Sequence, residues 1–172
     1  MRRPRFLNTI LGVVIAAGCA GDPASPLEPQ AQASLLGGLT STVTGVLLSC
    51  TPLPASRTSV VIGSAGGVVD VGPHRLVIPK GAVSQPITIT GEVVSGNVNS
   101  VRFSPEGLKF AKTAALTMSY RNCGGIGMLL PKKIAYTDEL LNLLEILKSV
   151  DLSDQKMVTG DLKHFSRYAI AF

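Results

Sequence analysis

The most reactive side chains in this sequence belong to three cysteines and two histidines: Cys19, Cys50, Cys123, His74 and His164. Zinc sites place such ligands in closely spaced pairs, and these residues are far apart along the chain, so we expect no metal site. The carboxylates are scattered and provide no paired acid and base. The glycines at 124–127 lack the lysine and the strand-then-helix frame of a phosphate loop. We therefore expect no cofactor and no catalysis on a substrate.

The composition fits one modest domain with a single hydrophobic core. The chain has 172 residues, 45% of them hydrophobic, and a formal net charge of +5. Arg2, Arg3 and Arg5 lie in a segment that we expect to be removed, and without them the net charge falls to +2. No clustered basic face is left, and the chain has no Trp and only 5% aromatic residues. The sequence therefore predicts no nucleic-acid partner.

Residues 1–18 have the organisation of a secretory signal peptide. A positive start is followed by an apolar stretch from Phe6 to Ala17, which is too short to span a bilayer comfortably. The sequence Ile15-Ala16-Ala17-Gly18-Cys19 resembles the lipobox of bacterial lipoproteins, in which the cysteine is lipidated and becomes the first mature residue. Ala16 departs from that motif, where leucine is commonest. The alternative is ordinary cleavage that leaves a free thiol.

Lipid on Cys19 would hold the protein on a membrane without a spanning helix, because each buried methylene contributes about 0.8 kcal/mol. Ala20 follows the cysteine, whereas an aspartate there would resemble the inner-membrane retention signal of enteric bacteria. We therefore expect a lipid-anchored protein of the bacterial cell envelope, in the outer membrane or facing the periplasm.

Residues 19–56 are predicted to separate the anchor from the domain. From Ala20 to Ala33 the chain is rich in Pro, Ala, Ser, Gln and Gly, which is typical of a flexible tether. The stretch from Leu35 to Leu48 is more apolar. We interpret it as a poorly ordered apolar linker, and a short helix lying on the domain or the membrane is the alternative, weakened by Gly37 and Gly38.

If Cys19 carries lipid, Cys50 and Cys123 remain as a pair in an oxidising compartment. Cys50 precedes the domain, and Cys123 follows a strand predicted to end at Tyr120. One disulfide would join these two segments and stabilise the fold by about 4 kcal/mol. Two free thiols are the alternative.

Residues 57–172 are predicted to form an antiparallel β-sandwich. Short apolar runs alternate with Gly and Pro at turn positions, and strand alternates with turn about every ten residues. The clearest alternation runs from Ile87 to Val93, where Gly91 interrupts the pattern and marks a candidate bulge. Pro79-Lys80-Gly81 fits a β-turn. The fold class is therefore all-β.

Two motifs in this region resemble the ZU-5 domain of zonula-occludens proteins, netrin receptors and ankyrins, which also occurs in bacterial envelope proteins. The first is Ile78-Pro79-Lys80-Gly81-Ala82-Val83, and the second is Phe103-Ser104-Pro105-Glu106-Gly107-Leu108-Lys109-Phe110. The resemblance covers about residues 57–172. It implies a β-sandwich that binds proteins or cytoskeleton, here an unidentified envelope or extracellular protein.

The segment from Asp138 to Val150 has two interpretations. Leu140, Leu143, Leu144 and Leu147 have helical spacing. The resemblance instead implies strands at 134–136 and near 144–148, and tertiary pairing often overrides local propensity. We predict strands, with a short turn at 138–142.

The sequence His164-Phe165-Ser166 resembles a self-cleavage motif of some eukaryotic proteins in which a UPA domain follows a ZU-5 domain. That resemblance implies attack of the Ser166 hydroxyl on the Phe165 carbonyl, with His164 as general base. Phe165 is an odd-numbered position, whereas Tyr168, Ile170 and Phe172, which are predicted to point inward, are even-numbered. A continuous strand cannot bury both sets, so we expect a kink or bulge between them. No UPA domain follows, and we favour a terminal strand without cleavage. The other histidine, His74, is predicted to be exposed and inert in its turn.

The leading interpretation is a membrane-anchored envelope lipoprotein that displays a ZU-5-like β-sandwich as a structural or protein-interaction module. The alternative is a self-processing domain that cuts between Phe165 and Ser166.

Overall fold

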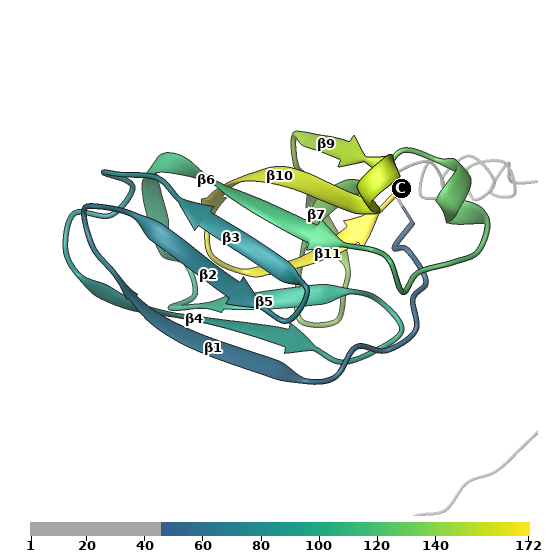
Figure 1. Cartoon of the computed structure of the whole chain (residues 1–172), viewed down its shortest axis with the longest axis horizontal. Helices are drawn as coiled ribbons and strands as arrows, with labels where there is room; N and C mark the ends of the chain where they lie inside the picture. Colours follow the sequence, from purple (N-terminus) through teal and green to yellow (C-terminus); the bar gives the residue numbers. More distant parts are fainter. Residues whose placement is uncertain (1–45) are drawn as a thin grey trace, which may run out of the picture.

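The computed structural model describes residues 46–172, which form two antiparallel sheets packed face to face (Figure 1). Cys19, the signal peptide and the predicted tether up to residue 45 lie outside the described residues. The predicted all-β sandwich is confirmed.

Each sheet draws strands from both halves of the described chain. The six-stranded sheet has the order β1 (Ser56–Ile62), β4 (Ile87–Val94), β5 (Ser100–Ser104), β11 (Arg167–Ala171), β7 (Lys133–Thr137) and β8 (Leu143–Ile146). The five-stranded sheet has the order β2 (Gly67–Val71), β3 (His74–Ile78), β6 (Lys109–Ser119), β10 (Met157–His164) and β9 (Ser149–Leu152). Two short 3-10 turns, η1 (Ile126–Leu129) and η2 (Ser153–Gln155), complete the described part.

The core lies between the sheets because alternate side chains of each strand point inward. In β4, Ile89 and Val93 are buried while Thr88 is exposed, as the alternation predicts. The predicted turn after β3 is also present, closed by the amide N–H of Ala82, which donates to the Pro79 carbonyl at 3.1 Å.

Gly91 does not mark a bulge, and that prediction was wrong. β4 pairs without a register shift on both sides, with Thr58 and Phe103 opposite Gly91. The glycine faces the core, where an added Cβ would lie 2.4 Å from Cγ2 of Val71 in the other sheet. Gly91 is therefore required for close packing of the two sheets.

The sandwich includes residues that the sequence placed in the apolar segment before the domain. The amide N–H of Leu48 donates to the Ile170 carbonyl at 2.9 Å, and the amide of Phe172 donates to the Val46 carbonyl at 3.1 Å. Leu48 is fully buried. Residues 46–48 thus pair with the end of β11, and at Leu48 the interpretation as a poorly ordered linker was wrong because the core encloses this side chain.

Cys50 and Cys123 form the predicted disulfide, with an S–S distance of 2.06 Å. The two residues also face each other as an isolated antiparallel bridge. The bond joins the segment before β1 to the segment after β6 and closes a loop with a sequence separation of 73.

The ambiguous segment forms strands, as predicted, with a turn between β7 and β8. The Asp138 carboxylate fixes this turn by accepting the amide N–H groups of Leu140 and Asn142 at 2.8 and 2.9 Å. The hydrogen bond from the Asn142 side chain, together with these backbone bonds, lowers the pKa of Asp138. β8 then pairs with β7 and β9 pairs with β10, so tertiary pairing prevails over the helical spacing of the leucines.

Candidate functional site at the His-Phe-Ser turn

The chain passes from one sheet to the other at the predicted self-cleavage motif. His164 ends β10 in the five-stranded sheet, and Arg167 begins β11 in the six-stranded sheet. The pairing of β10 with β6 also shifts register between Leu162 and His164. This break explains the opposite parity of Phe165 and Tyr168, which are both buried. The expected kink is therefore present.

Phe165 is held in the core on both its backbone and its ring. Its amide N–H donates to the Leu108 carbonyl at 2.8 Å, and its own carbonyl accepts the amide N–H of Gly107 at 3.0 Å. The ring stacks on Phe103 with centroids 5.2 Å apart and meets Phe110 edge-on at 4.9 Å. The peptide bond between Phe165 and Ser166 is consequently anchored to the β5–β6 connection.

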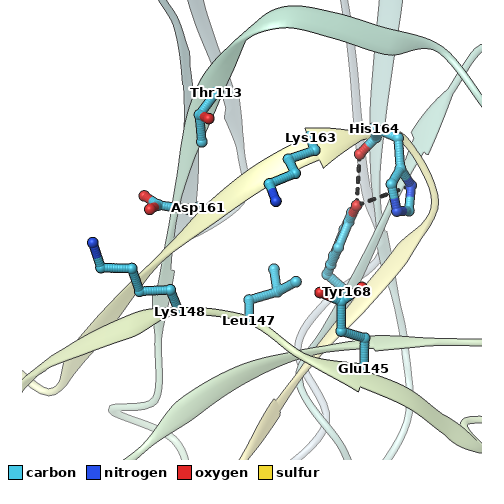
Figure 2. Close-up of a pocket in the computed structure, with 8 residues that line it drawn as sticks. All are labelled: Thr113, Glu145, Leu147, Lys148, Asp161, Lys163, His164 and Tyr168. Atoms are coloured by element: carbon cyan, nitrogen blue, oxygen red, sulfur yellow. Dashed lines mark hydrogen bonds between the residues drawn. The ribbon is translucent and has the colours of Figure 1, made fainter.

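The His164 side chain lies against two tyrosines. The Tyr168 hydroxyl donates to the His164 carbonyl at 2.5 Å and lies 3.5 Å from Nδ1 of the imidazole, as Figure 2 shows. The imidazole meets the Tyr136 ring edge-on, with centroids 5.0 Å apart. Burial raises the pKa of Tyr168, and the nearby Tyr136 and Glu145 raise it further. Tyr168 therefore remains a neutral hydrogen-bond donor near pH 7.

A cavity of about 300 Å³ opens beside His164 and Tyr168 (Figure 2). Its lining is polar and carries both signs of charge, from Thr113, Glu145, Leu147, Lys148, Asp161, Lys163, His164 and Tyr168. Within residues 46–172, no salt bridge joins the two lysines to the two carboxylates of this lining. Two acidic and two basic side chains line the cavity, so their formal charges balance.

The geometry provides part of what self-cleavage requires. The donor on the Phe165 carbonyl, the Gly107 amide, is placed where negative charge would develop if the Ser166 hydroxyl attacked. Ser166 is buried next to that carbonyl. Among the hydrogen bonds of the described residues, however, none joins the His164 imidazole to the Ser166 hydroxyl, because the imidazole lies beside Tyr168 instead. The base and the nucleophile are thus not paired in this conformation.

His74 is not exposed, so that prediction was wrong. The side chain is 1% exposed because it points inward from β3. Its Nδ1 accepts the amide N–H of Ser119 at 3.1 Å, while Nε2 is buried and has no hydrogen-bond partner among the described residues. Burial lowers the pKa of His74 from 6.5 to about 4. The imidazole is therefore neutral at pH 7.

Two buried cations were missed by the sequence reasoning. Lys132 donates from Nζ to the carbonyls of Met128 and Leu130. Arg167 donates to the Ser100 hydroxyl at 3.0 Å and to the Glu139 carbonyl at 2.6 Å. Lys132 precedes β7 and so lies outside any strand, and all five residues of β11, which begins with Arg167, are buried, so alternation gave no signal for either cation.

The described residues hold neither a cluster of three His, Cys, Asp or Glu side chains suited to a metal ion nor a helix long and apolar enough to cross a membrane. No family model and no curated protein matches this chain. The resemblance to the ZU-5 domain therefore stays a prediction.

Proposed function

We propose that this protein is a lipid-anchored lipoprotein of the bacterial cell envelope, which presents its β-sandwich as a protein-interaction module. The signal-peptide pattern and the lipobox-like sequence before Cys19 support the anchor. Within residues 46–172 the outer edge of β1 is unpaired, which supports the interaction because an unpaired strand edge can accept a partner strand through main-chain hydrogen bonds.

Four strands end the two sheets, and β1 is the most suitable acceptor among them. It has seven residues and pairs with β4 along its whole length without a bulge. Among residues 46–172, the backbone of 56–62 makes no hydrogen bond beyond those to β4. β2 has five residues, β8 and β9 have four each, and the pairing of β8 is irregular. Short and bulged edges resist strand addition, so β1 is the edge on which the proposal rests.

A photo-crosslinking residue at Val61 in living cells tests this edge. Val61 lies on β1 and is 65% exposed, while Val150 on β9 is 60% exposed and is the matched control. We expect a discrete cross-linked protein from position 61 and none from position 150. Equal adducts at both positions, or no adduct at 61, would contradict the proposal.

Self-processing between Phe165 and Ser166 is the second candidate, favoured by the Gly107 amide on the Phe165 carbonyl. Hydrolysis there would release residues 166–172, which include β11 at the centre of the six-stranded sheet. Intact-mass measurement of the purified protein under denaturing conditions is the test. A fragment that ends at Phe165 and is absent from Ser166→Ala would establish cleavage, and full-length protein alone would exclude it.

A further inference from the structure

The loop between the disulfide and β7 exposes three large aliphatic side chains. This loop, residues 124–131, contains η1, and its Ile126, Leu129 and Leu130 are 80%, 83% and 50% exposed. Figure 1 shows η1 (green) projecting beyond the sheets, at the end of the sandwich where β11 and the C-terminus lie. Three large aliphatic side chains exposed within five residues make this loop a candidate binding surface.

Contacts with the rest of the domain fix the backbone of this loop, and the fixed backbone holds its apolar side chains in solvent. Gly127 is buried, and an added Cβ there would lie 2.5 Å from the Phe172 ring. The buried Lys132 ammonium donates to the carbonyls of Met128 at 3.1 Å and Leu130 at 2.5 Å. The disulfide at Cys123 constrains the start of the loop. These contacts orient the backbone with Ile126, Leu129 and Leu130 toward solvent.

The charges around the loop are mainly positive. Arg121 and Lys133 flank it in sequence and are exposed. Lys156 is also exposed. It lies close to Arg121, because the Lys156 carbonyl accepts the amide N–H of Tyr120 and Arg121 donates to the carbonyl of Gln155. Asp154 is the exposed acid of this group, and Asp151, which lines a hollow with Leu129 and Leu130, is paired with the buried Lys132 at 4.0 Å. Exposed aliphatic side chains with an excess of basic residues nearby match the interface of an anionic bilayer.

A second exposed apolar site in the described chain has different surroundings. Leu140, in the turn at the far end of β7, is 84% exposed. It follows Asp138 and Glu139, and the Glu139 carboxylate is paired with Arg102, so the charges beside Leu140 lack the positive excess found around the loop. Two leucines of equal exposure therefore differ in charge environment, which makes Leu140 the internal control for Leu129.

We propose that residues 124–131 insert Ile126, Leu129 and Leu130 into the surface of an anionic bilayer. The basic residues around the loop contact the lipid headgroups, and the sandwich is held with β1 accessible to partners. This inference rests on the proposed membrane anchor for its biological setting. The chain from Cys19 to Val46 spans at most about 95 Å when fully extended, so lipid on Cys19 keeps the loop within reach of the membrane.

Tryptophan fluorescence tests the insertion directly because the chain contains no Trp. Leu129→Trp and, as control, Leu140→Trp are made in the full-length protein, and circular dichroism verifies that both fold like the parent. Each protein is reconstituted with vesicles of phosphatidylethanolamine and phosphatidylglycerol, with and without brominated acyl chains. We expect the residue at 129 to shift its emission to shorter wavelength and to be quenched at least about threefold more strongly than the residue at 140.

Equal quenching at the two positions, or water-like emission at 129 in vesicle-bound protein, would overturn the proposal. A shift at 129 that requires an added envelope protein and not lipid would assign the loop to a protein partner and overturn it equally. The mass of the same samples reports lipid on Cys19. Loss of the anchor is therefore distinguished from failure of the loop to insert.

Discussion

Acidification is expected to destabilise the sandwich through His74. The folded state holds this imidazole neutral, with a pKa of about 4, whereas the unfolded chain has the ordinary value of 6.5. Below pH 6.5 the unfolded state binds a proton that the folded state does not, so the free energy of unfolding falls as the pH falls toward 4. Each pKa unit corresponds to 1.36 kcal/mol, and the loss between pH 7 and pH 4 is therefore about 3 kcal/mol.

The structural cause is the environment of the ring. Nδ1 already accepts the Ser119 amide, and a proton there would remove that bond. Nε2 is buried without an acceptor among the described residues, so a charged imidazole would have no compensating partner on that side. Asp70 and Asp138 have folded-state pKa values below their ordinary 3.8, so most of their own contribution to acid unfolding lies below pH 4.

Urea unfolding measured from pH 7 to pH 4 checks this prediction. His74→Asn retains an acceptor for the Ser119 amide but does not titrate. The free energy of unfolding of this variant should therefore depend much less on pH than that of the parent protein. His164→Asn removes the other histidine and should retain the slope, because His74 is intact. A flat profile in the parent protein, or the same slope in His74→Asn, would refute the reasoning.

Three further predictions concern stability. Cys123→Ser opens the disulfide and should lower the free energy of unfolding by about 4 kcal/mol, measured against the parent without reductant. Gly91→Ala places a Cβ against Val71 and should cost about 1–3 kcal/mol in thermal unfolding, whereas Gly96→Ala meets no atom within 4 Å and should change little. Lys132→Met removes the donor to two loop carbonyls and should cost about 1–3 kcal/mol; an unchanged melting temperature would contradict the role of this lysine.

Alternation and turn chemistry were sufficient to predict the sandwich. The pattern from Ile87 to Val93 identified the inward side chains of β4, and the prolines and glycines marked the turns. The parity conflict between Phe165 and Tyr168 indicated a break, which is the point where the chain changes sheets. These signals are local, because strand period and turn geometry depend on neighbouring residues.

The errors arose where a residue's environment is created by distant parts of the chain. His74 follows a Gly-Pro turn, yet pairing with β2 and β6 turns it into the core. Gly91 was interpreted from its own strand, and its role depends on Val71 in the opposite sheet. Leu48 is buried against the end of β11, far away in sequence. The cavity beside His164 likewise combines side chains of β6, β8, β10 and β11 with the turn before β9.

The mass of the mature protein, purified from bacterial membranes without reductant, tests the central proposal most directly. The account predicts a chain that begins at Cys19, carries acyl groups on that residue and lacks the two hydrogens of the Cys50–Cys123 thiols. A mature chain with an unmodified Cys19, or one that begins elsewhere, would contradict the membrane anchor.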